Sequence, residues 1–349
     1  MTREVVITGY AHHSARSAAP DFVAAQDPAS LDFSGQIPNR SDLRAQGLSQ
    51  LLGSYTAGLA LDMAGLKGEA EILADADLMV ATHFGERDRE TDQAVLEAVC
   101  AEGAGEESLN RELSNLRPSL FLAQLQNLFA ANISIVHGVL GTSITFMGET
   151  PAGARVVDEA RRRVLCGRSE IILVGAVFNG LRPDILEVHD ARAFGDDAEG
   201  EREGQGDEDR LALGFGAAFL LLESGEHAAK RGAGPRARLR EMVQTRFEDA
   251  LDAAALGLDP AAPLLVLHDA TGKDHVGRVE RRLRALAPDA DIRNLAAVTG
   301  SLMEASFPFA ASFAAGQLDR RSGAGGGQAL ICSTGPGPHG TLAVMKQEV

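Results

Sequence analysis

The sequence has 349 residues, of which 45% are hydrophobic and 23% are charged. This length and composition are typical of a globular protein with a sizeable core, and they exclude a chain that is disordered throughout. The formal net charge of −16 argues against a nucleic-acid partner, because binding to a phosphate backbone depends on clustered Lys and Arg.

Short apolar runs that alternate with amphipathic segments predict an α/β fold. Runs rich in Val, Ile and Leu are typical of strands that helices cover on both faces. In chain order, we expect strands at residues 4–8, 76–81, 143–147, 170–174, 217–222, 264–267 and 329–332. We expect helices at residues 50–64, 119–129, 153–166, 275–287 and 309–318.

Two polar stretches interrupt this pattern. Residues 196–209 carry eight acidic side chains and one arginine, and a segment with so little to bury is expected to form a solvated loop. Its alternating carboxylates leave a calcium loop as an alternative, although the spacing does not match an EF-hand. The Gly-containing stretch at 230–236 predicts the boundary between a first half at 1–229 and a second half at 236–349.

The N-terminus and the cysteines indicate a cytoplasmic protein. Residues 1–9 are a charged start followed by a short apolar strand, without the long apolar region of a signal peptide. No apolar run approaches the roughly twenty residues that span a bilayer, so we expect no membrane insertion. The cysteines Cys100, Cys166 and Cys332 form no CxxC pair, and we expect no disulfide framework, no metal site and no cofactor.

Several segments resemble the β-ketoacyl synthase family. NLFAANISIVHGVLGTSITFMGET at 127–150 resembles the family's segment that ends in the nucleophilic cysteine. REVVITG at 3–9 is similar to its opening strand, and RRRVLCGRSEIILVG at 161–175 is similar to its helix, glycine and strand. LGFGAAFLLLE at 213–223 resembles a glycine-rich strand of the family. Because the order of these segments is kept, the resemblance covers nearly the whole chain.

The resemblance implies a specific architecture. Members of this family have a thiolase-like, five-layered αβαβα fold of two similar halves, with the site between the halves and a dimer that forms through the first half. The second half, at 236–349, is shorter here than is usual in the family. We therefore expect part of the acyl pocket or lid to be absent.

Three positions depart from the chemistry that the resemblance implies. A ketosynthase uses a thiolate to accept the acyl group, and two histidines promote decarboxylation. Thr150 stands at the cysteine position, and its hydroxyl lacks the low pKa of a thiol, so a pocket or core hydroxyl is the alternative to a poor nucleophile. Ser301 in the motif TGS stands at the second histidine, and Ala296 stands at the family's lysine.

The resemblance retains only the first histidine. LLVLHDATG at 264–272 is similar to the family's strand that ends in His-Gly-Thr, and it predicts that His268 faces the site. Asp269 and Ala270 depart from that motif. Pro336, in the final glycine-rich loop, stands where the family has a gating phenylalanine. Cys332 resembles the acid/base cysteine of thiolases, with a buried inert thiol as the alternative.

These positions predict a degenerate site. Its catalytic positions are Thr150, His268 and Ser301, and no residue among them is assigned as catalytic. The residues expected to line the site for a substrate are Thr150, His268, Thr299, Ser301 and Pro336.

The predicted function is that of a non-condensing ketosynthase-like subunit that resembles a chain-length factor. Such a subunit pairs with a catalytic β-ketoacyl-ACP synthase in fatty-acid or polyketide (polyene) biosynthesis and is inactive alone. Chain-length factors commonly have glutamine where this chain has Thr150. The partner is a catalytic ketosynthase in a heterodimer or a second copy in a homodimer, and the acidic acyl carrier protein is expected to dock through the partner because like charges repel.

Two alternatives remain open from the sequence. One is a divergent acyltransferase that uses Thr150, Ser143 or Cys332 with His268. The other is a pseudoenzyme that binds a ligand in the old pocket without turnover. Covalent acylation by a thioester would distinguish the first alternative from a non-condensing subunit, and stabilisation by a ligand would favour the second.

Overall fold

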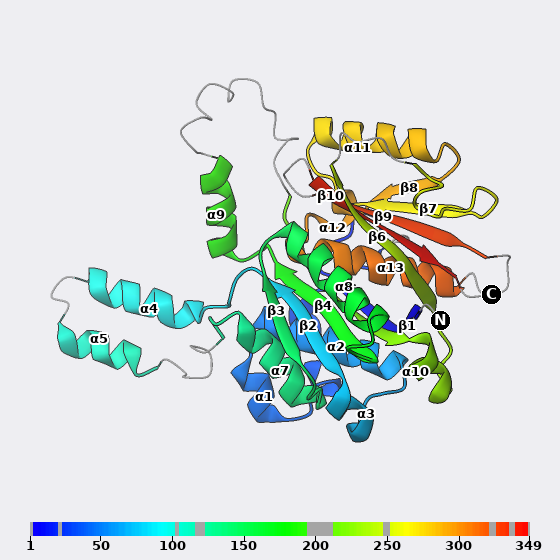
Figure 1. Ribbon diagram of the computed structural model, residues 1–349. Coiled ribbons are helices and arrows are strands. Elements are labelled where there is room, and N and C mark those ends of the chain that lie inside the picture. Colours follow the sequence, from blue (N-terminus) through cyan, green and yellow to red (C-terminus); the bar gives the residue numbers. More distant parts are fainter. Residues whose placement is uncertain are drawn as a thin grey trace.

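A computed structural model describes residues 3–19, 23–101, 105–115, 123–193, 212–246, 252–320, 326–334 and 339–347. Within these ranges, ten strands form one hydrogen-bonded sheet in the order β3-β2-β4-β5-β1-β6-β10-β9-β7-β8 (Figure 1). The strands are β1 (Val5–Ser14), β2 (Asp77–Thr82), β3 (Ser143–Met147), β4 (Ile171–Asn179), β5 (Phe215–Ser224), β6 (Ala237–Arg246), β7 (Leu264–His268), β8 (Asp291–Asn294), β9 (Gln328–Thr334) and β10 (His339–Lys346).

The strand order repeats between the two ends of the sheet. In the first half, β2 lies between its parallel neighbours β3 and β4, and the antiparallel strands β5 and β1 follow. In the second half, β7 lies between its parallel neighbours β8 and β9, and the antiparallel strands β10 and β6 follow. The halves join where β1 pairs with β6 through Val6 with Arg238 and Ile7 with Ala237. The predicted two similar halves are therefore confirmed in topology.

Helices arrange the sheet into five layers (Figure 1). A central layer lies between the two halves of the sheet, and outer layers cover the far faces. The outer layer of the first half contains α2 (Leu48–Met63) and α7 (Asn127–His137), the central layer contains α8 (Thr150–Leu165) and α13 (Ser306–Arg320), and the outer layer of the second half contains α11 (Lys273–Leu286).

Alternating side chains of the strands hold these layers together. In β2, Met79 contributes to the central core and Leu78 to the core under α2 and α7, because successive side chains of a strand point to opposite faces. The central core takes apolar residues from both halves, including Val174 of β4 and Ile331 of β9. A third core lies between α11 and the second half of the sheet. The described residues at 252–263 form turns where the first half has α2.

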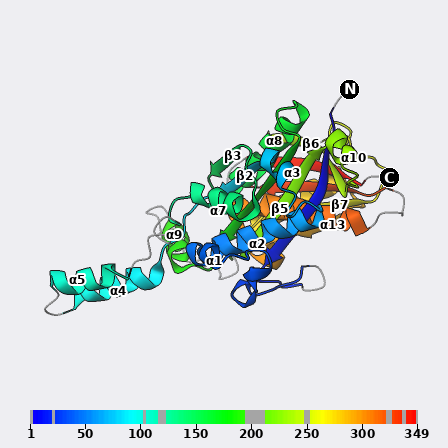
Figure 2. The same ribbon diagram turned by 90° about the horizontal axis from the view of Figure 1, so that it is seen from below.

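The remaining elements are short or lie outside these layers. Helices α4 and α5 project from the body, as two views show (Figures 1 and 2). These elements are α1 (Arg40–Ala45), α3 (Ala70–Asp75), α4 (Arg89–Cys100), α5 (Glu106–Leu113), α9 (Pro183–Ala193), α10 (Gly225–Lys230), α12 (Ala296–Thr299) and the 3₁₀ helices η1 (Pro28–Ser30), η2 (Phe33–Gly35) and η5 (Met303–Ala305). Among the described residues, no helix is long and apolar enough to cross a membrane.

The structure corrects several expected elements. Of the helix expected at 119–129, residues 119–122 lie outside the described residues, residues 123–126 form turns, and α7 begins at Asn127. Strands β6, β8 and β10 and helices α4, α5 and α9 were not expected. The sequence pattern does not predict strand β6, because charged side chains at several of its positions interrupt any apolar run. The acidic stretch at 196–209 lies outside the described residues, and the division at 1–229 and 236–349 stays a prediction.

Candidate functional site

The carboxyl ends of three parallel strands meet at one edge of the sheet. Strand β2 ends at Thr82 and is followed by His83, β3 leads into Thr150, and β4 ends at Asn179. In open parallel sheets this edge is where side chains converge on a ligand. The candidate site lies here, against the 3₁₀ helix η5 that precedes α13.

Thr150 occupies the first turn of α8 and is buried. Its exposed fraction is 7%. Pro151 follows it, and proline in the first turn favours a helix start because its missing N–H needs no partner there. The Thr150 hydroxyl contacts Met303 Sδ at 3.8 Å, and a thioether is a weak acceptor and no base. The contact therefore leaves the hydroxyl without activation.

Met303 stands in an unusual backbone conformation. Its φ is 46°, and it is the one non-glycine residue with positive φ in the described part of the chain. A side chain with a Cβ adopts this region at an energetic cost, so surrounding contacts must hold it. The side chain is buried beside Thr150. The strained backbone thus places the Met303 side chain against Thr150, the residue at the nucleophile position of the family.

Glu304, the next residue, is a carboxyl group in the interior. Its exposed fraction is 2%. Oε1 accepts a hydrogen bond from the His83 backbone N–H at 2.9 Å, while Oε2 is buried without a hydrogen-bond partner among the described residues. Burial raises the pKa of Glu304 to about 8, and the nearby Glu149 adds to the rise. The carboxyl group is therefore mostly protonated at neutral pH and can donate a hydrogen bond.

Two further contacts fix His83 next to Glu304. The backbone C=O of His83 accepts a hydrogen bond from Gln126 Nε2 at 2.6 Å. Its imidazole Nε2 lies 3.6 Å from Glu149 Oε1. His83, Glu149 and Glu304 thus form a polar cluster around the start of α8. They come from the segment that follows β2, the β3–α8 connection and η5.

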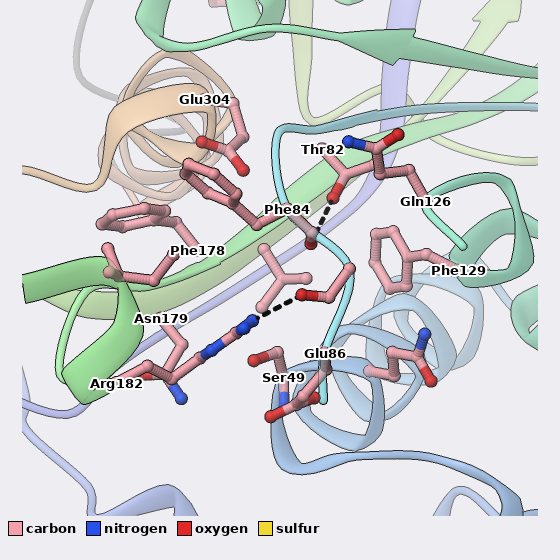
Figure 3. A pocket seen from close by; sticks show the side chains of 14 residues that line it. Ser49, Thr82, Phe84, Glu86, Gln126, Phe129, Phe178, Asn179, Arg182 and Glu304 are labelled. Atoms are coloured by element: carbon pink, nitrogen blue, oxygen red, sulfur yellow. Dashed lines mark hydrogen bonds between the residues drawn. The ribbon is translucent and has the colours of Figure 1, made fainter. Parts of the chain in front are cut away.

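A small cavity extends from Glu304 towards α2 (Figure 3). Its volume is about 30 Å³, and a cavity needs about 10–15 Å³ to hold one water molecule, so it has room for roughly two. Pockets that enclose an organic ligand have volumes of about 300–1,000 Å³. This cavity therefore does not hold an acyl chain. It is lined by Ser49, Gln50, Thr82, Phe84, Gly85, Glu86, Gln126, Phe129, Val177, Phe178, Asn179, Arg182, Ile185 and Glu304.

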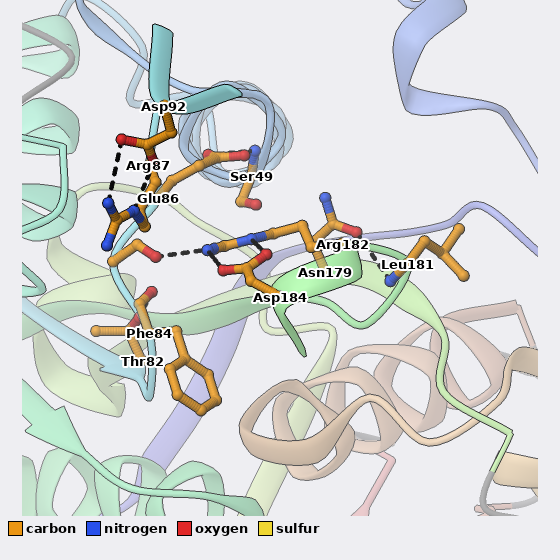
Figure 4. Close-up of polar contacts among 11 residues, drawn as sticks. Ser49, Thr82, Phe84, Glu86, Arg87, Asp92, Asn179, Leu181, Arg182 and Asp184 are labelled. Carbon is orange, nitrogen blue, oxygen red and sulfur yellow. Dashed lines mark hydrogen bonds and ion pairs between the residues drawn. The ribbon is translucent and has the colours of Figure 1, made fainter. Parts of the chain in front are cut away.

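Glu86 and Arg182 form the floor of this cavity (Figures 3 and 4). Glu86 Oε2 accepts the backbone N–H of Ser49 at 2.9 Å in the first turn of α2, where the helix dipole favours a negative charge. Burial nevertheless raises the pKa of Glu86, and Arg182 partly opposes that rise. Arg182 donates from Nη1 to the Gly85 carbonyl at 2.8 Å and pairs with Asp184.

Ser301 and Thr299 lie on the loop that leads to Met303. The Ser301 backbone N–H bonds to the Ala212 carbonyl at 2.7 Å, and its C=O accepts from the Gly214 N–H at 2.9 Å. The Thr299 hydroxyl donates to backbone carbonyls of its own segment. Both side chains are buried. Ser301 precedes Met303, the residue that contacts Thr150, by two positions. Its backbone hydrogen bonds attach this loop to the segment just before β5.

The structure does not bring His268 to this site. His268 ends β7, and its Nε2 lies 3.6 Å from Glu280 Oε1 on α11. In the sheet register it stands beside Cys332 of β9, which belongs to the core under α11. Burial lowers the pKa of the His268 imidazole and raises the pKa of the Cys332 thiol. Both side chains lie in the outer core of the second half.

Asp269 points away from that outer core, as expected one residue further along the strand direction. It is buried and accepts hydrogen bonds from Ser333 Oγ and the Thr334 N–H, each at 2.6 Å. Burial raises the pKa of its carboxyl group. Asp269 therefore links the carboxyl ends of the neighbouring parallel strands β7 and β9.

The other predicted positions are separate from Thr150. Ser143 is exposed at the start of β3, about 13 Å along that strand from its end at a rise of about 3.3 Å per residue. Cys100 is exposed at the end of α4, Cys166 is exposed just beyond the far end of α8, and Cys332 is buried in β9. Pro336 lies outside the described residues. Among the described residues, no group of three His, Cys, Asp or Glu side chains could hold a metal ion.

Sequence reasoning missed the acidic member of the site. Glu304 stands alone among apolar neighbours in SLMEASFPFA at 301–310, and an acid in an apolar run is a signal of a buried polar group. Glu86 and Arg182 carry no such signal, because each lies in a polar stretch of sequence. Their convergence depends on the packing of the β2–α4 connection against α2 and α9.

A family model matches half of the chain. Residues 50–228 match the model of the β-ketoacyl synthase N-terminal domain. The matched range includes the segment from β2 through α8 to β5, and with it Thr150 and the polar cluster at His83.

Solved structures with the same architecture are similar over the whole chain. A type II polyketide synthase acyl-carrier protein in complex with its ketosynthase bound to the hexaketide (AntDE:AntF) gives a TM-score of 0.73 at 16% identity, with all of both chains covered. A β-ketoacyl synthase from Burkholderia phymatum STM815 gives 0.71 at 17% identity, also over all of both chains. The ishigamide ketosynthase/chain length factor gives 0.67 at 19% identity and covers 99% of this chain and 100% of that chain.

At these identities the likeness establishes the fold. The five layers, the repeated topology and the central pair of helices are those of the thiolase-like αβαβα architecture. The expected fold class is therefore confirmed.

Proposed function

This chain belongs to the β-ketoacyl synthase family, and we propose that it serves there as a non-condensing subunit, similar to a chain-length factor, that pairs with a catalytic ketosynthase. The observation that carries the proposal is Thr150, a hydroxyl whose contact is a thioether, at the start of α8. An acyl-transfer nucleophile needs an adjacent base or a low pKa. The three cysteines of the chain lie elsewhere.

The small cavity supports the same proposal. The cavity beside Glu304, with a volume of about 30 Å³, leaves no space for an acyl chain there. The side chain of Met303 contacts Thr150, and the protonated carboxyl group of Glu304 belongs to the next residue of η5. An acyl chain would therefore lie in the partner or at the interface with it, as the fatty-acid or polyketide product of the pair is extended.

A free sheet edge supports pairing through the first half. Strand β3 is the end strand of the sheet, and an open edge with apolar side chains offers backbone groups to another strand. Ile135, Leu140 and Met147 around it are 69%, 67% and 69% exposed. An open groove of about 600 Å³ between α7 and β3 lies alongside. The partner's own edge strand would extend the sheet here.

The structure does not favour the acyltransferase alternative. His268 stands beside Cys332 in the sheet register and not beside Thr150 or Ser143. Cys332 is itself a poor nucleophile, because burial raises the pKa of its thiol. The described residues give no support to a ligand-binding pseudoenzyme at Glu304 either, since the cavity there has room for roughly two water molecules. The acyl carrier protein is expected to dock on the partner, because this chain has a net charge of −16.

Native mass spectrometry of the tagged protein, purified from its own host, tests the proposal. We expect a one-to-one complex with a ketosynthase that has the active-site cysteine. A Met147→Lys change, which places a charge on the exposed edge, should reduce capture of that ketosynthase by at least about tenfold, since a buried unpaired charge is costly. Val243→Lys is the matched control, because Val243 is an exposed apolar residue on β6, away from the edge.

The condensing step is tested separately with the purified chain. Incubation with acyl-carrier and malonyl-carrier thioesters should give neither an acylated protein in intact-mass spectra nor a β-ketoacyl product. A homodimer that becomes acylated on Thr150 or Cys332 and turns over would refute the proposal.

A further inference from the structure

Two buried polar atoms without hydrogen-bond partners belong to residues that line the same small cavity. These atoms are Glu304 Oε2 and Ser49 Oγ, and neither has a partner among the described residues. Glu304 lies in η5 and Ser49 in the first turn of α2, and the two residues are 2% and 9% exposed. Both line the cavity of about 30 Å³ (Figure 3). Because buried polar atoms almost always have a partner, two such atoms at one cavity point to a ligand between them.

The size of the cavity limits this ligand. A volume of about 30 Å³ exceeds the roughly 10–15 Å³ that one water molecule needs. It is about a tenth of the volume of the smallest pockets that enclose an organic molecule. The ligand is therefore no larger than a pair of water molecules.

The lining of the cavity is polar enough to bind water. Gln126 donates from Nε2 to a backbone carbonyl, which leaves its Oε1 as an acceptor. Thr82 Oγ1 makes one long contact of 3.4 Å with a backbone carbonyl, and the carboxyl group of Glu86 lines the cavity as well. A buried water typically makes about three hydrogen bonds, whereas a cavity lined by apolar side chains stays dry. With Glu304 and Ser49, this cavity offers enough polar groups for two waters.

We propose that the cavity binds two water molecules, which connect the Glu304 carboxyl group to the Ser49 hydroxyl and so join η5 to α2 by hydrogen bonds. Glu304 Oε1 accepts the His83 N–H, so the proton of the neutral carboxyl group lies on Oε2 and is donated to the first water. Ser49 Oγ both donates and accepts, which lets it bind the second water. This water site goes beyond the proposed pairing with a ketosynthase, because it needs no partner subunit.

The two waters link the surroundings of Thr150 to α2. Met303, which contacts Thr150, is the residue before Glu304. Water-mediated hydrogen bonds are nearly as favourable in enthalpy as direct ones. A change at Ser49 is therefore expected to alter the protonation of Glu304, although no hydrogen bond joins the two side chains directly.

A high-resolution crystal structure of the purified protein tests the water site directly. We expect two ordered waters, one at about 2.5–3.0 Å from Glu304 Oε2 and the other at about the same distance from Ser49 Oγ. A cavity without electron density would overturn the proposal. A single cation, recognised by six or more oxygen ligands at about 2.0–2.6 Å, would overturn it as well.

Ser49→Val tests the same site in solution. Valine removes the hydroxyl and adds apolar volume at the cavity, so the waters should be expelled. We expect the pKa of Glu304 to rise by about half a unit or more, because the loss of hydration and of a hydrogen bond favours the neutral carboxyl group. NMR of the glutamate carboxyl carbons measures this pKa, and the resonance of Glu304 is assigned by its absence from Glu304→Gln.

Thr56→Val is the matched control. Thr56 is a fully buried hydroxyl on the same helix, and its Oγ1 donates to the Leu52 carbonyl at 2.7 Å. It does not line the cavity, so its loss should leave the pKa of Glu304 unchanged. Ser49→Ala removes the hydroxyl without adding volume and should give a smaller rise, and it replaces Ser49→Val if the valine variant does not fold. An unchanged pKa in the Ser49 variants, or an equal rise in Thr56→Val, would overturn the proposal.

Discussion

At the scale of single residues, the side chains around Thr150 are mostly uncharged at neutral pH. Thr150 cannot ionise near neutral pH, and its contact is the uncharged Met303. Glu304 is buried, with Oε2 unpaired among the described residues, and its pKa is raised to about 8. An interior of this kind stabilises no thiolate or enolate, because charge stabilisation requires donors preorganised around the reacting atoms. The residues themselves therefore support a subunit that shapes a site.

The raised pKa of Glu304 makes stability depend on pH. The unfolded chain loses this proton near pH 4.5 and the folded protein retains it to about pH 8. Between these values the unfolded state binds fewer protons, so stability falls as pH rises. Each unit of pKa shift corresponds to about 1.4 kcal/mol. We expect Glu304→Gln to match the wild type at pH 4.5 and to exceed it by at least about 2 kcal/mol at pH 8.

Urea denaturation at pH 4.5, 6 and 8 measures this difference. Gln at 304 keeps an acceptor for the His83 N–H, so the comparison isolates the charge. The exposed Glu187→Gln variant should follow the wild type at all three pH values. A constant gap between Glu304→Gln and the wild type would show that Glu304 does not titrate as its burial indicates.

At the scale of elements, the close approach of α8 and η5 places Thr150 against Met303. Gly153 of α8 permits it, because a Cβ there would overlap the Glu304 carbonyl oxygen. Glycine in a helix is otherwise unfavourable by about 0.5–1 kcal/mol relative to alanine. The residue is therefore present for the contact between the helix and the loop, at a cost to the helix itself.

Two glycine-to-alanine changes test this contact. Gly153→Ala should destabilise the protein by about 1–3 kcal/mol, because overpacking forces the backbone of η5 to move. Gly277→Ala on α11 is the matched control, since a Cβ at 277 meets nothing within 4 Å, and it should stabilise the protein by about 0.4–1 kcal/mol. Urea denaturation measures the free energy of unfolding of each variant for comparison with the wild type. Equal effects at both positions would contradict the close approach.

At the scale of the whole molecule, the two halves share one central core. Helices α8 and α13 lie between them, and the core that they form takes side chains from β4 of the first half and β9 of the second. The sheet itself is joined across the halves by two residue pairs of β1 and β6. The halves therefore depend on each other, even though each repeats the same topology.

Expression of the halves tests this dependence. Residues 1–229 alone should lack cooperative unfolding, because the central face of their sheet would be open to water. Co-expression of 1–229 with 236–349 should restore a soluble complex, since the shared core is then buried. Heteronuclear NMR of each sample gives the answer. A well-dispersed spectrum of 1–229 alone would mean that this half is an independent domain.

The sequence alone determined the fold class and the family, and most strands of the core follow from it. The run at 143–147 coincides with β3. The run at 264–267 coincides nearly with β7, which is buried along most of its length, because a strand covered on both faces must be apolar throughout. Thr150 could also be located from sequence, since the segment that carries it is continuous. These features depend on residues that are close together in the sequence, so they can be predicted without the tertiary structure.

Only the tertiary structure decided how the site is composed. In a strand, a shift of one residue moves a side chain to the other face, and this places His268 under α11 while Asp269 points away. The burial of Glu304, the convergence of Glu86 and Arg182, and the projection of α4 and α5 arise from contacts between distant segments. Burial and facing depend on the neighbours that the fold brings together, and no residue pattern along the chain encodes those neighbours directly.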